Sequence, residues 1–472
     1  MILVVDLDGS LLKVDLFKES LGKSFLRKPR VFLKTVALAF KSRSEAKNFI
    51  AKIFRIEYST LPYNNSIIDL INNYIGKGYK IILATGATHL YADPIANHLG
   101  LFTEVIATNE INNIGQNKLD AIINEVGNDF IYLGDSIKDL PIWMHCKKAI
   151  LVGAKTNIIK KLIKNNVEII DIVKKEKSNF RILLKQLRIH QWSKNLLLFV
   201  PALASHQIMM PGIFINALTG FIAFSLLASS IYVLNDIVDI DHDRKHPKNK
   251  NRPIAAGELS ILSAYVILLV CLMGGGLLAQ YLGNTFFLVV VIYIVLNLLY
   301  SFYLKKAIIL DVILLMSFYI IRLIAGHTPD AISLSPWLLS FSMFLFFSLG
   351  FLKRYADTII IRENNASLLD GRGYSIDDGN MLMLLGVGSG LVSALVLTLY
   401  TGSEQVKVFY ATPMLLVGLS PIMLYWISRI WLLAERGVIE SDPVLFTIKD
   451  THSYVVVFCF LSIILLSKYL VL

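Results

Sequence analysis

The distribution of apolar residues changes near residue 190. Before it, short apolar runs alternate with stretches rich in Lys, Asn and acidic residues. After it, long apolar runs dominate, and most are close to the ~20 residues that cross a bilayer as a helix. The pattern predicts an α/β head followed by an all-α membrane domain. Nine spans are expected, at 195–210, 212–234, 261–283, 285–304, 308–326, 336–355, 380–402, 409–433 and 453–472, and the first is short and contains Pro201.

In the first part of the chain, "ILVVDLDGS", "YKIILATGAT" and "FIYLGDSIKDLP" each join an apolar run to polar residues. Alternation of such runs with helical stretches predicts a parallel sheet, in which the carboxyl ends of the strands gather at one edge. Candidate functional residues at this edge are Asp6, Asp8, Thr85, Asp135 and Asp139, and Lys118 lies between the last two strands.

The expected boundaries follow from the same pattern. The head covers residues 1–170, a charged linker and amphipathic entry helix cover 171–187, and the membrane domain covers 188–472. We expect residues 15–60, approximately, to form a helical cap. Its segment "FLRKPRVFLKTVALAFKSR" is both basic and apolar. That segment is either a helix lying on the membrane surface or a buried cap helix with a solvated basic edge.

Charge indicates how the spans are oriented. The net charge of +11 does not predict nucleic-acid binding, because the cations cluster at the ends of apolar segments. One set of loops carries thirteen Lys and Arg residues, whereas the alternate loops carry Lys407. By the positive-inside rule, we expect a multi-pass protein of the inner (cytoplasmic) membrane with its head and polar loops in the cytoplasm.

The stretch "YVLNDIVDIDHDRKHPKNKNRPIAAG" follows the second expected span. Asp236, Asp239 and Asp243 are three and four positions apart, so on a helix they would share one face. Asn235 lies one turn before Asp239 on the same side. Like charges at a membrane boundary are costly unless a cation neutralises them, and carboxylates suit Mg²⁺. The alternative is a solvated loop whose acids and bases neutralise each other. The regular spacing favours a Mg²⁺–diphosphate site, with phosphate contacts from His246, Lys248, Lys250 and Arg252.

The string "NDIVDIDHD" resembles the N-D-x-x-D-x-x-x-D signature of the UbiA superfamily of membrane transferases. With "LRIHQWSKNLLLFVPALAS" and "GFLKRYAD", residues 181–472 are similar to the branch that transfers phosphoribose from phosphoribosyl diphosphate to a polyprenyl phosphate. Aromatic prenyltransferases carry a second Asp pair in the fifth helix. Here Asp311 is followed four residues later by Leu315, which favours the phosphoribosyl branch.

This resemblance implies nine helices around one cytoplasm-facing cavity. Mg²⁺ would be held by Asp236, Asp239, Asp243 and Asp311, and the loop "RENNASLLDGRGYS" would close over the ribose phosphate. For Lys194 and Lys305, snorkelling at the interface is the alternative. The implied substrate-binding residues are Lys194, Asn235, Tyr300, Lys305, Lys353, Arg354, Arg362 and Arg372.

The polar residues of the head, in their order, resemble the haloacid dehalogenase (HAD) phosphatase superfamily over residues 1–170. The resemblance implies that Asp6 is the nucleophile and Asp8 the general acid/base, and that Thr85 and Lys118 contact the phosphoryl group. It also implies a Mg²⁺ site formed by Asp6, Asp8, Asp135 and Asp139.

Together the halves predict a bifunctional enzyme that makes a lipid-linked phosphoribose and removes its 5-phosphate. One rival is a UbiA prenyltransferase that uses a prenyl diphosphate and an aromatic or other small acceptor. The other is a head that regulates or docks without turnover. The prenyl chain length, the final acceptor of the pentose and the formation of a homo-oligomer are left open.

Overall fold

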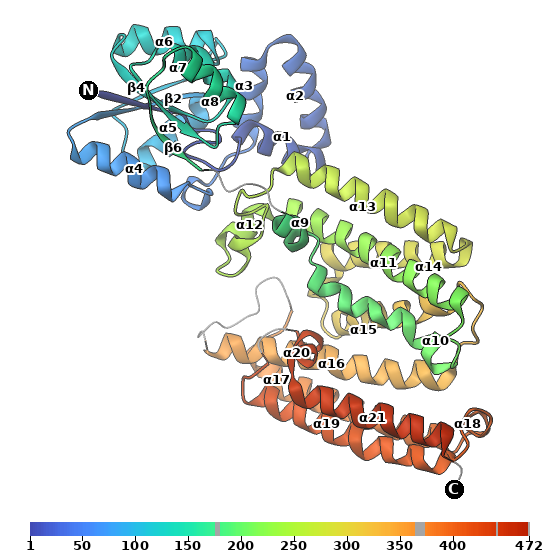
Figure 1. Cartoon of the computed structure of the whole chain (residues 1–472). Coiled ribbons are helices and arrows are strands. Elements are labelled where there is room, and N and C mark those ends of the chain that lie inside the picture. Colours follow the sequence, from blue (N-terminus) through green and yellow to red (C-terminus); the bar gives the residue numbers. More distant parts are fainter. Residues whose placement is uncertain (175–179, 364–372, 440–441, 471–472) are drawn as a thin grey trace. The chain divides into compact units, whose positions relative to one another are not determined.

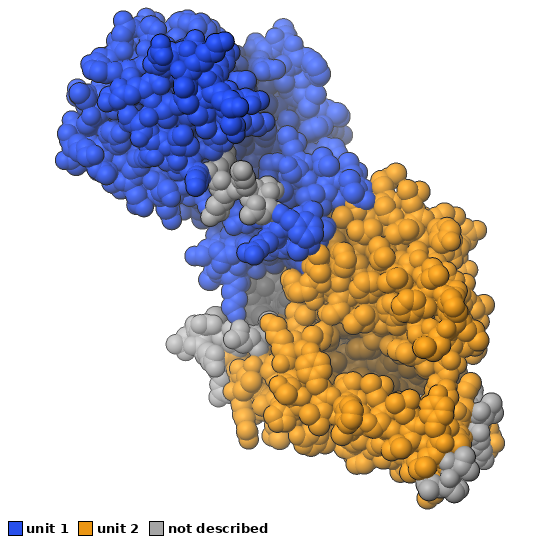
Figure 2. Space-filling view, in the orientation of Figure 1, with its two compact units in different colours: residues 1–188, 232–270 blue, residues 189–231, 271–472 orange. Residues whose placement is uncertain are grey.

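The computed structural model describes residues 1–174, 180–363, 373–439 and 442–470 (Figure 1). These residues form two compact units, coloured blue and orange in Figure 2. Unit 1 comprises Met1–Arg188 and Tyr232–Val270, and unit 2 comprises Ile189–Ile231 and Cys271–Leu472. The acidic stretch that follows the second expected span therefore packs in one unit with the head.

Six parallel strands form the sheet of the head, in the order β3-β2-β1-β4-β5-β6. This confirms the predicted parallel α/β region, and β6 extends the sheet beyond residue 170. The strands are β1 (Ile2–Val5), β2 (Lys80–Thr88), β3 (Glu104–Thr108), β4 (Phe130–Gly134), β5 (Lys148–Val152) and β6 (Ile169–Val173).

Helices cover both faces of this sheet, which explains why β1 is a continuous apolar run. Leu3 and Val5 of β1 pack in one core cluster, whereas Val4 packs in the other, as alternation along a strand requires. The first cluster includes residues of α4 (Asn65–Gly76) and α5 (His89–Leu99). The second includes residues of α6 (Gln116–Val126), α7 (Leu140–His145) and α8 (Thr156–Lys164).

The region expected to form the cap contains three helices, α1 (Leu16–Arg27), α2 (Pro29–Lys41) and α3 (Arg43–Ile53). The side chain of Asp15 caps α1 by accepting a hydrogen bond from the backbone of Lys18. Pro29 is the first residue of α2, where the N–H that proline lacks would have no partner within the helix. Leu33 and Phe40 of α2 are exposed, so this helix presents apolar side chains at the surface of unit 1.

The second segment of unit 1 begins within α11 (Pro211–Val238) and continues through α12 (Ile240–Lys245) to the start of α13 (Ile261–Tyr281). Val233, Ile237 and Ile254 form a small core here, against which Ile182 of α9 (Phe180–Gln186) packs. This core holds the acidic stretch in a defined conformation.

Eight helical segments in the described residues are long and apolar enough to cross a membrane, consistent with a multi-pass protein. The expected first span, 195–210, is instead the 3-10 helix η3 (Ile189–Phe199) and the short α10 (Val200–Ala204), interrupted at Pro201. Nine spanning helices are thus not found among the described residues. The eight are Pro211–Val238, Ile261–Tyr281, Asn284–Phe302, Leu310–His327, Pro336–Ile359, Ile376–Thr401, Pro413–Glu435 and Thr451–Tyr469.

Within unit 2, the main apolar core joins α15 (Leu310–His327), α16 (Pro336–Glu363), α17 (Gly379–Thr401) and α19 (Leu419–Glu435). The remaining helices are α14 (Asn284–Phe302), α18 (Glu404–Phe409), α20 (Pro443–Lys449) and α21 (Thr451–Tyr469). Gly386 of α17 lies against the Trp431 ring, where a Cβ would collide, so this glycine lets α17 and α19 pack closely.

Candidate active sites

A cavity of about 840 Å³ lies within unit 1, at the carboxyl edge of the sheet. Its lining includes five of the six polar residues that the sequence assigned to this edge: Asp6, Asp8, Lys118, Asp135 and Asp139. Because the strands are parallel, residues separated by more than 100 positions meet here. The sixth, Thr85, is buried and its hydroxyl accepts a hydrogen bond from the backbone of Ala87; the neighbouring Gly86 lines the cavity.

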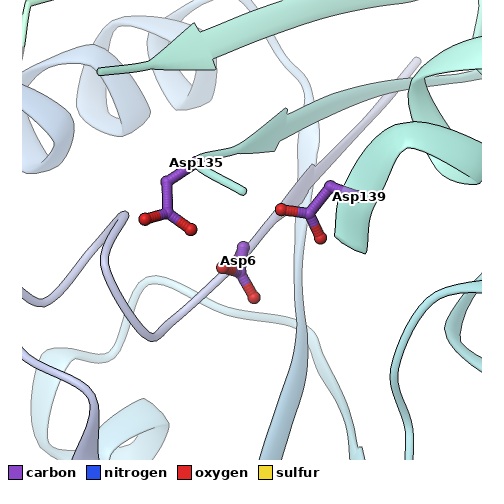
Figure 3. A group of neighbouring side chains, drawn as sticks. All are labelled: Asp6, Asp135 and Asp139. Atoms are coloured by element: carbon purple, nitrogen blue, oxygen red, sulfur yellow. The ribbon is translucent and has the colours of Figure 1, made fainter. Parts of the chain in front are cut away.

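Asp6 follows β1 at the centre of the cluster. Its Oδ1 accepts a hydrogen bond of 2.6 Å from Lys118 Nζ, and Oδ2 accepts one of 3.4 Å from Ser10 Oγ. Lys118 Nζ also lies 3.5 Å from Asp139 Oδ1, so the ammonium group bridges two carboxylates. Figure 3 shows Asp6, Asp135 and Asp139 beside one another at the strand ends.

The turn after Asp6 depends on Gly9. This residue has a φ of +80°, and a Cβ at this position would collide with the Asp135 carboxylate. Glycine both adopts the left-handed backbone and leaves room for that carboxylate. Asp8, one residue earlier, accepts a 3.1 Å hydrogen bond from the backbone of Leu16, which ties it to the start of α1.

The cluster concentrates negative charge in a buried place. Burial raises the pKa of the Asp6 carboxyl to about 7, although Lys118 opposes the shift. The pKa of the Asp8 carboxyl is raised well above its usual value, first by burial and then by the charge of Asp15. Burial disfavours the charged form of Lys118, but Asp6 and Asp139 more than offset it and raise the pKa of the ammonium. The site therefore has more carboxylates than one lysine neutralises.

These carboxylates fit a divalent cation. One oxygen from each of Asp6, Asp135 and Asp139 lies within 4.8 Å of the other two, and hard oxygen ligands of this kind suit Mg²⁺. Tyr132 and Ser136 hold Asp139 through hydrogen bonds of 2.8 Å from the phenol and 3.1 Å from the backbone. The ligand set is thus positioned by neighbouring residues.

Lys47 of α3 is a further cation at this cavity that the sequence analysis did not single out. It donates hydrogen bonds to the Gly86 carbonyl and to Asn112 Oδ1, the latter at 2.8 Å. Burial lowers its pKa to about 8 against the attraction of Asp8 and Asp15, while Lys138 and Arg43 act in the same direction as burial. A lysine in a cap helix has no local pattern that marks it, because only the fold brings α3 over the strand ends.

The second candidate cluster surrounds the acidic stretch. Asp236 is buried and its carboxylate accepts from three donors: Gln186 Nε2 at 3.0 Å, Arg188 Nη2 at 2.5 Å and Arg252 Nη1 at 3.1 Å. Gln186 and Arg188 precede the first membrane segment and were not predicted to take part. Asp236 is therefore surrounded by hydrogen-bond donors and cations.

Arg252 links two of the predicted metal ligands. Its Nη1 lies 2.9 and 2.7 Å from the two oxygens of Asp243, besides its contact with Asp236. Burial raises the pKa of Asp243, although Arg252 opposes the shift. Asp239 occupies the turn between α11 and α12. Among the described residues, these three aspartates do not form a close carboxylate trio like that of the head, so the arrangement as it stands pairs acids with arginine.

The other predicted residues near this stretch lie at its surface. His246 and Lys248 are exposed, and His246 Nδ1 accepts hydrogen bonds from the backbone of Lys248 and Asn249. Asn235 lies in the last turns of α11 and is partly buried. Backbone hydrogen bonds from Asp239 to Asn235 and from Asp243 to Asp239, both 2.8 Å, continue the helical path across the turn.

In unit 2, Asp311 and Arg354 form a fully buried ion pair, with Arg354 Nε 2.5 Å from Asp311 Oδ2. The other oxygen of Asp311 accepts a 2.6 Å hydrogen bond from Tyr374. Arg354 also donates to Tyr300 at 3.0 Å and to Asp357 at 2.9 Å. Three predicted site residues, Tyr300, Asp311 and Arg354, are thus brought together, with the Asp311 carboxylate bound to protein donors.

Lys194 forms an ion pair of 2.5 Å with Asp442, which precedes α20 and was not among the predicted residues. Lys305 lies in the 3-10 helix η5 (Leu304–Lys306), and Lys353 lies in α16. Arg372 lies outside the described residues, and the side chain of Arg362 is not described either. The predicted loop closure over a ribose phosphate therefore stays a prediction.

Comparison with known proteins bears on the membrane half. The family model described as "UbiA prenyltransferase family" matches residues 196–437, a little over half of the 472 residues. The chain belongs to the UbiA prenyltransferase family. The UbiA match begins within η3 and ends after α19, and it includes the acidic stretch.

Two curated relatives illustrate the range of the similarity. An uncharacterized protein of Sinorhizobium fredii, y4nM, is 34% identical over 454 residues, covering 96% of this chain and 88% of the relative. The chain is also 34% identical over 195 residues to decaprenyl-phosphate phosphoribosyltransferase of Mycobacterium tuberculosis. That match covers 39% of this chain and 63% of the mycobacterial protein.

Among solved structures, a UbiA homolog from Archaeoglobus fulgidus bound to DMAPP and Mg²⁺ is similar, with a TM-score of 0.44 and 15% sequence identity. The match covers 59% of this chain and 96% of the archaeal protein.

Proposed function

We propose that this UbiA-family protein is a bifunctional membrane enzyme. Its membrane half transfers 5-phosphoribose from phosphoribosyl diphosphate to a polyprenyl phosphate, and its head, resembling HAD phosphatases, removes the 5-phosphate of that product. The observation that carries the proposal is that the Asp6–Lys118–Asp135–Asp139 cluster and the acidic stretch of a UbiA transferase lie in one compact unit. A phosphatase tethered to the enzyme that makes its substrate meets that substrate at high effective concentration.

Two observations support the choice of donor. The UbiA half is similar to decaprenyl-phosphate phosphoribosyltransferase, and Leu315 stands where aromatic prenyltransferases carry a second acid. In the transfer, the bond between the anomeric carbon and the diphosphate breaks. A bond forms from that carbon to an oxygen of the lipid phosphate, and the diphosphate leaves with its electron pair. The attacking phosphate is already anionic at neutral pH, so positioning matters more than a general base.

In the head, the Asp6 carboxylate would attack the phosphorus of the ester, and the alcohol would leave with a proton from Asp8. Water would then hydrolyse the aspartyl-phosphate, with Asp8 taking the proton back. The buried Asp8, whose pKa is raised well above its usual value, suits a group that must hold a proton at neutral pH. Lys118 and Lys47 would offset the charge of the incoming phosphate.

We propose Mg²⁺ as the metal of both reactions. Asp6, Asp135 and Asp139 would hold one ion, with Asp8 beside them, and Asp236, Asp239 and Asp243 would hold another. When bound, the ion stabilises negative charge on phosphate oxygens. In the membrane half, this assignment requires Arg252 to exchange Asp236 and Asp243 for the phosphates of the donor. The bias of Lys and Arg among the loops supports a cytoplasmic location of both sites in the inner membrane.

The test incubates purified full-length protein with Mg²⁺, polyprenyl phosphate and labelled phosphoribosyl diphosphate, and mass spectrometry then identifies the lipid products. We expect the wild type to yield the dephosphorylated lipid, Asp6→Asn to accumulate the 5-phosphorylated lipid, and Asp239→Asn to yield neither. Asp69→Asn, an exposed acid on α4, is the matched control and should behave as wild type.

A UbiA prenyltransferase acting on a small acceptor is the second candidate, because prenyl transfer is the activity for which the family is named. If wild-type protein places no ribose on the lipid but consumes a prenyl diphosphate, that candidate replaces the phosphoribosyl assignment. If the lipid keeps its 5-phosphate with wild type as with Asp6→Asn, the head does not act on this product.

A further inference from the structure

The cavity of the head has walls of two kinds. At the end of β1 it is lined by the carboxylates and Lys118 described above. Elsewhere the lining is largely apolar, and we give the name apolar wall to five of these side chains: Val36, Phe40, Leu259, Ile261 and Leu262. A site for a small water-soluble phosphate ester has no need of such a wall, because the phosphate and its nearest atoms fit at the polar end.

Four of the five residues of the apolar wall come from two elements that are distant in sequence. Val36 and Phe40 belong to α2 of the cap, and Ile261 and Leu262 begin α13, which is long and apolar enough to span a membrane. All of these residues belong to unit 1. If α13 spans the membrane, its first residues lie at the bilayer surface, and the part of the cavity next to Ile261 would lie there too. The wall would then join the polar end of the cavity to the lipid.

Two members of the wall are exposed although they are large and apolar: Phe40 is 89% and Leu262 is 47% exposed. Leu33, also on α2, is 66% exposed. Apolar side chains of this size gain free energy when they leave water, and a group of them beside a cavity indicates an apolar ligand or lipid. Of the two alternatives for the basic, apolar cap segment, this exposure favours a helix that meets the membrane surface.

Cations also line this cavity. Lys13, Lys18, Arg43, Lys47 and Lys138 all line the cavity, in addition to Lys118. Lys18 is paired with Asp15 at 2.8 Å, which leaves Lys13, Arg43, Lys47 and Lys138 beyond the Lys118 and divalent cation that would offset a phosphate monoester on Asp6. They suit a substrate that carries a second anionic group, such as a phosphodiester, between its monoester and its apolar part.

From these features we infer that the head acts on a phosphate monoester borne by a lipid, with the start of the lipid chain on the apolar wall. The inference rests on the proposed phosphatase function and adds how the cavity would recognise its substrate: the phosphomonoester at the polar end, a second anionic linkage at the cations, and the first part of a prenyl or similar chain on the apolar wall. The chemistry is the one given above: the P–O bond of the monoester breaks, water supplies the new oxygen, and inorganic phosphate leaves.

The test uses full-length protein in neutral detergent micelles and two substrates with the same reacting end. One is methyl 5-phosphoriboside, and the other is the same sugar phosphate joined through a phosphodiester to a C20 prenyl chain. Phosphate release gives kcat/KM for each. The variant Phe40→Ser/Leu262→Ser alters the two exposed members of the wall, which are the least needed for folding. Ile163→Ser, an exposed apolar residue of α8 outside the cavity, is the control.

We expect wild type and the control to prefer the prenylated substrate by at least tenfold in kcat/KM. The wall variant should lower this preference to threefold or less while keeping its kcat/KM for the methyl compound. Equal hydrolysis of the two substrates by wild type overturns the inference and leaves the phosphatase function standing. A preference that survives in the wall variant overturns the assignment of the wall. If neither compound is hydrolysed, the proposed phosphatase function itself fails.

Discussion

Glu19 of α1 and Arg244 of α12 form a buried bidentate ion pair, with Nη1 and Nη2 of the arginine 2.8 and 2.7 Å from the two carboxylate oxygens. Lys23 joins them, at 2.7 Å from Glu19 and 2.6 Å from Asp241. Arg27 adds a contact of 2.9 Å to Asp241. The first helix of the cap is thereby joined by charge to the acidic stretch of the transferase.

The ion pair between Glu19 and Arg244 makes the free energy of unfolding depend on pH in the acidic range. Burial alone would raise the pKa of Glu19, but Lys23 and Arg244 outweigh burial and lower the pKa from 4.5 to about 2. A depressed carboxyl pKa stabilises the fold above the unfolded value and loses that contribution as pH falls from 4.5 through 2. The expected loss is about 3 kcal/mol. Thermal unfolding of detergent-solubilised protein between pH 5 and 2 measures it.

In Glu19→Gln/Arg244→Gln both charges of the pair are removed, so the unfolding midpoint should fall less steeply over this pH range than in wild type. The exposed Glu45 provides a control, because Glu45→Gln should keep the wild-type slope. Identical slopes for all three proteins would show that Glu19 does not cause the acid sensitivity.

The lowered pKa of Lys47 leads us to expect that phosphate binding in the head weakens at alkaline pH. Burial lowers its pKa to about 8, so its positive charge is present below that pH and is lost above it. Lys118 stays charged, because Asp6 and Asp139 raise its pKa. We expect KM for a soluble phosphomonoester to rise severalfold above pH 8. Lys47→Arg should remove the rise, and Lys52→Arg, at an exposed position of α3, should not.

Arg252 is expected to serve the transferase and not the phosphatase. Its guanidinium holds Asp236 and Asp243, and hydrogen bonds to charged groups contribute ~1.5–3 kcal/mol each. Arg252→Gln should therefore lower ribose transfer to the lipid by about tenfold or more. Hydrolysis of a soluble ester should change by less than about twofold, and Arg436→Gln, at an exposed position, should change neither. A parallel fall of both activities would indicate a folding defect.

Because Asp311 and Arg354 form a buried ion pair, we expect the effect of replacing one of them on the free energy of unfolding to depend strongly on whether the other is present. Both side chains are 0% exposed, so Asp311→Leu leaves the buried guanidinium with Asp357 as its remaining carboxylate partner and should cost ~3–5 kcal/mol of unfolding free energy. Arg354→Met in the same chain should restore much of that stability without restoring ribose transfer. Thermal unfolding with a transfer assay checks both statements, and failure of the double variant to regain stability contradicts the pairing argument.

The sequence predicted correctly that the polar residues of the head meet at one edge of the sheet, because one local rule places them. Apolar runs mark buried parallel strands, and the residues after such strands meet at one edge, which is where Asp6, Asp135 and Asp139 lie. Lys47 was not predicted, because nothing in the sequence around it indicates that α3 covers this edge of the sheet.

For the membrane half, local spacing was less informative. The spacing of Asp236, Asp239 and Asp243 predicts one helix face, but the donors that reach Asp236 include Arg188, 48 residues earlier in the chain. Hydropathy also predicted a span at 195–210, where the chain forms η3 and a short helix after Pro201. Hydropathy measures how apolar a segment is, and it does not include side-chain contacts such as the 2.7 Å hydrogen bond from Arg322 to Asn195 in η3.

Because unit 1 is built from two separated segments of the chain, no single cut divides the protein into its two units. A recombination event that exchanged residues 1–188 alone would leave Arg244 and Asp241 without Glu19 and Lys23. Substitutions in the first cap helix and in the acidic stretch are therefore expected to occur together. Once the two segments have adapted to each other in this way, loss of the head would leave the charged residues of the acidic stretch without their partners.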